Sequence, residues 1–146
     1  IRSFFSKSSP LAFQILSDLH LEVGQQCSSF IIPPSAAYLI LAGDIGRLID
    51  YESYLAFLAK QAAQFEQVFL ILGNHEFYGL SFHAGLERAQ KLENEAVLKG
   101  KLVLLHRRRC NIPNSEITIL GCTLWSNLPE DAREVVRVKV KDFEKI

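Results

Sequence analysis

The amino-acid sequence predicts an α/β fold in which parallel strands are joined by crossover helices. The first observation is that short, mostly apolar runs occur at residues 13–17, 38–42 and 68–72. Runs of this kind are typical of strands that are buried on both faces of a sheet. The second observation is that a helical pattern separates the second run from the third. The order strand, helix, strand implies parallel neighbours joined by a right-handed crossover.

Two helices are predicted from the spacing of apolar residues. The first covers residues 51–65, and Asp50 stands where it would cap the amino end. The second covers residues 81–98, where Gly100 supplies the stop. The apolar positions of the first helix recur with the helical period, and they are Tyr51, Tyr54, Leu55, Leu58, Ala62 and Phe65.

The two ends of the chain are less regular in sequence. Residues 1–12 are rich in serine, and we interpret them as a mobile leader. Further strands are predicted at residues 101–105 and 117–120, joined by a basic turn that contains residues 107–109. For residues 131–141, alternating valines favour a strand, whereas the first part of the segment favours a helix, so both interpretations stay open.

The composition is that of a folded domain without a strong charge. The chain has 146 residues, of which 49% are hydrophobic, and its formal net charge is zero. This excludes a disordered, highly charged protein, and it gives no strong signal for nucleic-acid binding. No apolar run is long enough to span a membrane. Three cysteines without C-x-x-C spacing favour reduced thiols, so we expect a cytoplasmic or nuclear location.

Polar side chains follow the first three predicted strands, at the point where each of these strands ends. Asp18 and His20 follow the first strand, Asp44 the second, and Asn74 and His75 the third. Because the carboxyl ends of parallel strands meet at one edge of a sheet, we expect these side chains to converge. Carboxylates, an amide oxygen and imidazoles without a thiolate suit Mn, Fe, Zn or Ni, and they argue against a structural zinc finger.

The order of these motifs resembles the amino-terminal half of the calcineurin-like metallophosphoesterases. Each motif alone is weak, because a single Asp-x-His or Gly-Asp is commonly a turn or a helix cap. The ordered set carries the resemblance, and it consists of Asp18-Leu19-His20, Gly43-Asp44 and Gly73-Asn74-His75-Glu76. The resemblance implies a two-sheet αββα sandwich, in which helices flank the paired sheets.

The resemblance also implies a reaction and a site. Two divalent or trivalent metal ions would share a bridging carboxylate, and a metal-bridging hydroxide would attack the phosphorus of a phosphoester substrate. Asp18 and His20 would bind the first ion, Asp44 would bridge the two ions, and Asn74 would bind the second. His75 would be the general acid that protonates the leaving oxygen. Glu76 would hold one of these ligands in place.

The sequence departs from the family pattern at two points. Many relatives carry an aspartate three residues after the bridging one, where it orients the catalytic histidine, but this chain has Arg47. An arginine there is suited to steering a phosphate instead. In addition, no histidine follows His106, so the later histidine motifs of the family have no counterpart. With so few donors, we expect this chain by itself to bind metal poorly and to hydrolyse little.

Residues 13–146 are therefore expected to form the amino-terminal portion of a metallophosphoesterase-like domain whose carboxy-terminal metal-ligand half is absent from this chain. The sequence contains no methionine, and it stops in the charged stretch 141–146. Both observations also lead us to expect that this chain is part of a longer polypeptide. One layer of a sandwich leaves the inner apolar face of its sheet exposed. That face would need the missing carboxy-terminal half or a protein partner to cover it.

Several features keep more than one interpretation. His83 and His106 have no partner motif, so each favours a surface or a hydrogen-bonded histidine over a ligand, and residues 107–109 favour a solvated turn. Trp125 favours buried packing, with a substrate pocket as the alternative. For the whole protein, the alternative to an enzyme is a catalytically inactive phosphoesterase-like binding or scaffold protein. The substrate stays open among phosphoproteins, nucleotides, nucleic acids and small phosphodiesters.

Overall fold

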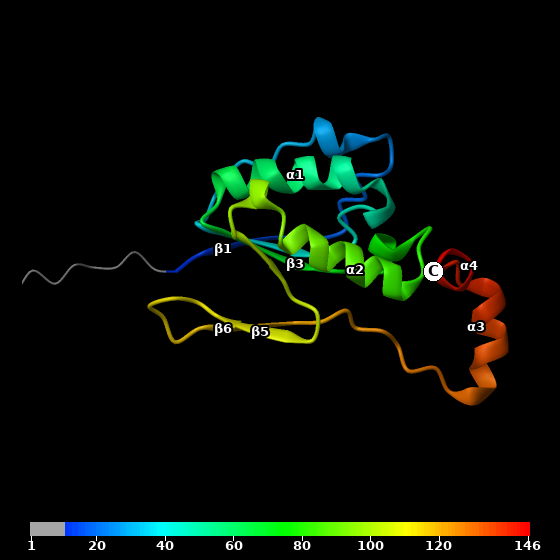
Figure 1. The fold of residues 1–146 in the computed structure, drawn as a ribbon. Coiled ribbons are helices and arrows are strands. Elements are labelled where there is room, and N and C mark those ends of the chain that lie inside the picture. The colour runs from blue at the N-terminus through cyan, green and yellow to red at the C-terminus, as the bar shows by residue number, and fades with distance from the viewer. Residues whose placement is uncertain (1–10) are drawn as a thin grey trace, which may run out of the picture.

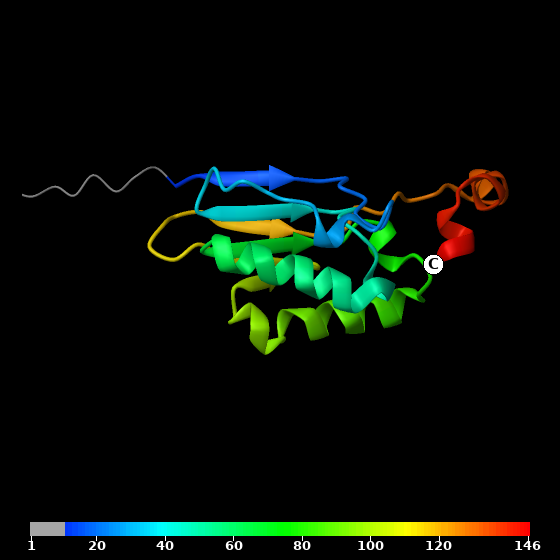
Figure 2. The same cartoon turned by 90° about the horizontal axis from the view of Figure 1, so that it is seen from above.

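Four parallel strands form the central sheet, as the sequence predicted. The computed structural model describes residues 11–146, so most of the predicted leader lies outside the described residues. The strands are β1 (Phe13–Leu16), β2 (Tyr38–Ala42), β3 (Gln67–Ile71) and β4 (Leu102–Leu104), and they lie side by side in chain order. All their carboxyl ends therefore point the same way (Figure 2).

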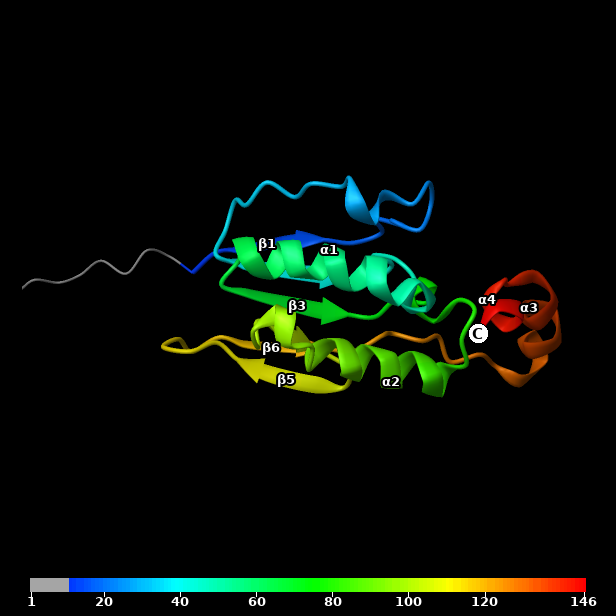
Figure 3. The same ribbon diagram turned by 45° about the horizontal axis from the view of Figure 1, so that its top comes forward.

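Two crossover helices cover one face of this sheet (Figure 3). Helix α1 (Tyr51–Gln64) joins β2 to β3, and α2 (Phe82–Glu93) leads from β3 towards β4. Phe57 and Leu58 of α1 are buried with Leu39 and Leu70 of the sheet in the main apolar core. The helices thus fix the strands from one side and leave their carboxyl ends accessible.

The ends of the two helices differ from the sequence prediction. Asp50 precedes α1, but its side chain makes no capping hydrogen bond, because Arg47 binds its carboxylate instead. Helix α2 ends at Glu93, short of the predicted residue 98. The Asn94 side chain donates to the backbone oxygen of Gln90 at 2.8 Å, which competes with a further helical turn. A separate 3-10 turn, η4 (Ala96–Leu98), follows.

A hairpin covers part of the other face (Figure 1). Its strands are β5 (Arg108–Asn111) and β6 (Thr118–Gly121), which pair antiparallel. Phe69 and Val103 of the sheet are buried there with Ile112 at the end of β5. The prediction that residues 107–109 form a turn was wrong in part. Arg108 and Arg109 lie in β5 because they pair with β6, and both residues are exposed.

Residues 131–139 are helical, which decides between the two interpretations of the segment 131–141. Helices α3 (Arg133–Lys139) and α4 (Asp142–Lys145) lie beyond the carboxyl end of the sheet (Figure 1). The backbone oxygen of Lys145 accepts a hydrogen bond from Gly79 at 2.8 Å, which ties α4 to the segment after β3. Among residues 11–146, no helix combines the length and the apolar character that crossing a membrane requires.

The connection from β1 to β2 is irregular but anchored in the core. It contains one short 3-10 turn, η1 (Gln26–Ser28), which lies against α1. Leu21 and Cys27 are buried, and so is Ile32, which is 1% exposed. The neighbouring Ile31 is 77% exposed. Two adjacent isoleucines therefore face opposite environments, and Ile32 is one of the side chains that hold this loop on the domain.

The contrast between the two isoleucines predicts unequal effects on stability. We expect Ile32→Ala to lower the free energy of unfolding by about 2–5 kcal/mol, because it leaves a cavity in the core. The matched variant Ile31→Ala should change it by less than about 0.5 kcal/mol, because that side chain is already in water. Urea denaturation followed by circular dichroism measures both. Equal losses in the two variants would contradict the position of this loop.

Candidate metal site and acid–base site

The structure brings most of the predicted site residues to one edge of the sheet. Asp18, His20 and Asp44 each offer a ligand atom, and these atoms lie within 4.8 Å of one another. His20, Glu22 and His75 form a second such group with the same spacing. His20 belongs to both groups. The two clusters therefore make one continuous site at the carboxyl ends of β1, β2 and β3.

The backbone at this edge adopts an unusual conformation. Asp18, His20 and Asp44 have φ angles of 54°, 46° and 54°, in the left-handed region that residues other than glycine seldom occupy. Hydrogen bonds hold the strained loops together. The Asp18 N–H donates to the Gly43 oxygen, and the His20 N–H donates to the Asp44 oxygen, each at 3.0 Å. Such strain commonly occurs at functional sites, where the surrounding structure maintains it.

The Glu76 side chain joins the loops that follow β2 and β3. Its carboxylate is fully buried and accepts the backbone N–H groups of Gly73 at 2.6 Å, Asp44 at 3.0 Å and Ile45 at 2.8 Å. The Tyr54 hydroxyl donates to the same carboxylate at 3.2 Å. Burial raises the pKa of Glu76, although these backbone donors act in the opposite direction. Glu76 thus holds the loop that carries Asp44.

Asp44 fits closely against the loop after β3. Its Oδ1 accepts the backbone N–H of His75 at 2.9 Å. A side chain at position 73 would not fit, because a Cβ on Gly73 would lie 2.6 Å from the Asp44 nitrogen and 2.8 Å from its Cγ. The glycine of the Gly-Asn-His-Glu motif therefore permits the close approach of the carboxylate.

Asn74 lies at the same edge but makes contacts that the sequence did not indicate. Its Nδ2 donates to Asp142 Oδ1 at 2.8 Å and to the Tyr78 hydroxyl at 3.0 Å. The Tyr78 hydroxyl also donates to Asp142, and burial and this carboxylate raise the pKa of Tyr78 to about 12. Because Asn74 uses its nitrogen as a donor here, its Oδ1 is the atom that suits a metal ion.

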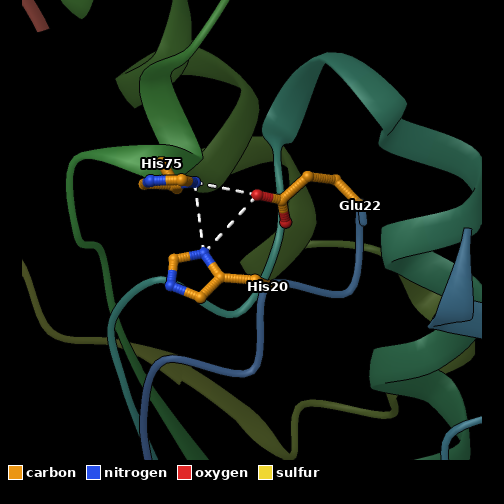
Figure 4. A group of neighbouring side chains, drawn as sticks. All are labelled: His20, Glu22 and His75. Carbon is orange, nitrogen blue, oxygen red and sulfur yellow. Dashed lines mark hydrogen bonds and ion pairs between the residues drawn. The ribbon is translucent and has the colours of Figure 1, made fainter. Parts of the chain in front are cut away.

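Glu22 contacts both histidines, and sequence reasoning missed it. Its Oε1 lies 2.8 Å from Nδ1 of His75 and 3.5 Å from Nδ1 of His20 (Figure 4). Burial acts to raise the pKa of Glu22, but the hydrogen bond with His75, a backbone hydrogen bond and the nearby imidazoles together outweigh it, so the pKa lies below its ordinary value. One sequence feature could have identified Glu22 as a site residue. Asp18, His20 and Glu22 alternate with two leucines, so the polar pattern of the motif continues to Glu22.

Arg47 takes no part in these contacts. Its guanidinium binds the Asp50 carboxylate, with Nε and one terminal nitrogen 2.9 Å and 2.8 Å from Oδ2. His83 is exposed and pairs with Glu87, as expected for a surface residue. His106 is half-buried, and burial together with Arg107 lowers its pKa.

An open pocket of about 920 Å³ lies beside the site. Asn74 and Asp142 line it together with Trp125, which is 44% exposed. The expectation that Trp125 is buried by packing was therefore wrong, and its pocket-lining alternative describes the structure. Trp125 does contact the aromatic residues Phe77 and Phe82, with ring centroids 6.0 Å and 6.3 Å away.

The donor set fits a divalent metal ion. Asp18 and Asp44 offer carboxylate oxygens and His20 offers an imidazole nitrogen, and their ligand atoms lie close enough to share one ion. Asn74 adds an amide oxygen at the same edge. Oxygen and imidazole donors without thiolate suit Mn, Fe, Zn or Ni. The residues predicted from the sequence thus form a chemically coherent set of ligands.

The position of Glu76 predicts a large loss of stability when its carboxylate is removed. We expect Glu76→Ala to lower the free energy of unfolding by at least about 3 kcal/mol, because several buried N–H groups would lose their acceptor. The control Glu87→Ala removes an exposed carboxylate and should change stability by less than about 0.5 kcal/mol. Thermal and urea denaturation test this. A Glu76→Ala protein as stable as the control would show that the carboxylate does not hold these loops.

Comparison with known proteins agrees with this geometry. An uncharacterized protein of Acanthamoeba polyphaga mimivirus is 27% identical over 143 residues, which cover 90% of this chain and 50% of the relative. The crystal structure of a phosphopantetheinyl hydrolase from Mycobacterium tuberculosis is similar, with a TM-score of 0.62 and 17% identity over 92% of this chain and 54% of that chain. The chain thus spans about half the length of these relatives.

The structural likeness confirms the predicted α/β architecture of metallophosphoesterase type. The family model described as calcineurin-like phosphoesterase matches residues 13–135, from β1 into α3. This match includes every residue of the sheet edge that carries the candidate ligands. The chain belongs to the calcineurin-like phosphoesterase family.

Proposed function

We propose that the complete protein is a metal-dependent hydrolase of phosphoesters. The observation that carries this proposal is the convergence of Asp18, His20 and Asp44 at one sheet edge, with their ligand atoms within 4.8 Å of one another. Membership of the phosphoesterase family supports the same reaction class. The substrate within that class stays open, because the fold does not choose among phosphoesters.

Each site residue has a proposed role. Asp18 and His20 would hold the first of two ions, Asp44 would be shared between the ions, and Asn74 would hold the second. When bound, the ions lower the pKa of a water molecule and offset charge on the phosphoryl oxygens. The hydrogen bond from the His75 N–H to Asp44 Oδ1 supports a shared role for Asp44, because it leaves the carboxylate fixed in one orientation.

His75 is the proposed general acid. Its ring lies between two aromatic neighbours, with the His20 and Tyr78 centroids each 4.3 Å away, so its position is well defined. It belongs to the same edge as the ligands, which would bring its Nε2 near the leaving oxygen of a bound ester. Protonation of that oxygen lowers the barrier to bond cleavage, and the effect is greatest for alcohols that are poor leaving groups.

We also infer that residues 13–146 are the amino-terminal portion of a larger catalytic domain. Support comes from the face of the sheet opposite α1 and α2, where the hairpin covers β3 and β4 but Ile15 of β1 is 64% exposed. Leu120 of β6 and Leu124 beyond it are 76% and 93% exposed. A carboxy-terminal half or a protein partner would cover these apolar side chains and supply the remaining ligands.

The role of Asp44 predicts a loss of activity without a loss of fold. We expect Asp44→Asn in the full-length protein to reduce hydrolysis of bis(4-nitrophenyl) phosphate by at least about 100-fold, because an amide cannot bridge two cations as a carboxylate does. Its circular dichroism spectrum should match that of the wild type. The control Asp131→Asn alters an exposed carboxylate on η5 (Glu130–Ala132) and should retain activity. Wild-type turnover by Asp44→Asn would contradict the proposed metal-bridging role of Asp44.

Metal dependence gives a second test. We expect EDTA followed by gel filtration to abolish hydrolysis, and added Mn²⁺, Fe²⁺, Zn²⁺ or Ni²⁺ to restore it to different extents. Full activity after complete metal removal, verified by elemental analysis, would contradict the proposed chemistry. Absence of hydrolysis with every metal and with both phosphate monoesters and diesters would favour the binding or scaffold protein.

A further inference from the structure

We propose that Glu22 is a positioning residue that holds His75 with its proton on Nδ1 and its Nε2 facing the leaving group. This inference rests on the proposed function of His75 as general acid. In the reaction, the proton on Nε2 moves to the leaving oxygen, and the Nδ1–H stays hydrogen-bonded to Glu22. The histidine then remains neutral in the tautomer that can be protonated again at Nε2.

The geometry around Nδ1 of His75 carries the inference. Glu22 Oε1 lies 2.8 Å from this nitrogen, within hydrogen-bond distance (Figure 4). A carboxylate has no proton to donate, so the ring nitrogen that faces it must be the donor. A histidine whose Nδ1–H is bound in this way has its Nε2 free for proton transfer. The hydrogen bond therefore determines both the orientation and the tautomer of the ring.

The same carboxylate oxygen also lies near His20. Its Nδ1 lies 3.5 Å from Glu22 Oε1 and 3.2 Å from Nδ1 of His75. The two Nδ1 atoms are within hydrogen-bond distance of each other, so a His75 whose proton is on Nδ1 can share it between Glu22 and Nδ1 of His20. The two rings meet edge to face, with an angle of 67° between their planes. Glu22 Oε1 is thus near Nδ1 of both rings, but its hydrogen bond is with His75.

The backbone beside Glu22 is held in place, and the Glu22 side chain is mostly buried. Leu21 is fully buried, and its N–H donates to the Ile45 oxygen at 2.9 Å. The Gln26 N–H in turn donates to the Leu21 oxygen at 2.8 Å. The Glu22 side chain is 10% exposed, so it has little freedom to turn into solvent. A rigid support of this kind is what a positioning residue requires.

Neighbouring charged side chains do not offer the same contact. Asp44 uses Oδ1 for the backbone N–H of His75, not for its ring. Arg47 carries only donors and is bound to Asp50. Among the described residues, Glu22 is the carboxylate whose oxygen is hydrogen-bonded to the imidazole of His75.

The direct test is the tautomer of His75, measured by long-range ¹H–¹⁵N NMR in full-length protein labelled at histidine and freed of metal with EDTA. We expect His75 to carry its proton on Nδ1 in the wild type, and to shift towards the Nε2–H tautomer in Glu22→Ala. Glu22→Gln, which keeps an oxygen acceptor of similar size, should retain the Nδ1–H form. His75→Ala identifies the signal, and Glu87→Ala is the matched control that removes a carboxylate from a different histidine.

Two outcomes of this experiment would overturn the proposal. An Nε2–H tautomer in the wild type would do so, and it would favour instead an ion held by Nδ1 of both histidines and Glu22. An unchanged tautomer in Glu22→Ala would show that other groups orient the ring. Once the His75 signal is identified, the wild-type spectrum decides the first outcome, so that outcome does not depend on the folding of a Glu22 variant.

Leaving-group dependence then tests the consequence for catalysis. We expect Glu22→Ala to lower kcat for an alkyl phosphoester at least about 10-fold more than for the matching 4-nitrophenyl ester, because only the alkyl alcohol needs the proton. In a His75→Ala background, Glu22→Ala should have no additional selective effect. Equal losses on both esters would overturn the positioning role. An Nδ1–H histidine in a protein that hydrolyses neither ester would support the positioning and overturn the proposed function.

Discussion

The buried carboxylate of Glu76 is the interaction on which the candidate site depends. It belongs to the loop after β3, yet it accepts N–H groups from the loop after β2, at Asp44 and Ile45. A buried carboxylate is stable only when several donors surround it, so the two loops can adopt this geometry only together. The Glu76 carboxylate therefore positions both Asp44 and His75. A substitution that disturbs either loop is expected to displace both residues.

The parallel sheet supplies the frame for this anchor. Because β1, β2 and β3 are adjacent and run in the same direction, their carboxyl ends bring Asp18, Asp44 and Asn74 to one edge. The strained left-handed residues Asp18, His20 and Asp44 then turn the chain sharply, so that the side chains face one another. The cost of that strain is offset by backbone hydrogen bonds and by the buried core beneath.

Much of the sheet and part of the site could be predicted from the sequence, because both follow from local patterns. Apolar runs identified the four parallel strands to within about a residue, and polar residues after three of them identified the candidate ligands. Glu22 and Asp142 could not be found in this way. The contact of Glu22 with His75 depends on the path of an irregular loop, and Asp142 meets Asn74 across 68 positions of sequence. The strand that contains Arg108 was missed because its pairing with β6 outweighs the low strand propensity of charged residues.

The central claim is that this edge of the sheet binds two metal ions. The most direct measurement is anomalous diffraction from crystals of the full-length protein grown with Mn²⁺. The account predicts two anomalous peaks about 3.5–4 Å apart, one beside Asp18 and His20 and the other beside Asn74, with Asp44 in contact with both. No peak at this edge in a structure with all four side chains ordered, or peaks only elsewhere on the protein, would contradict it.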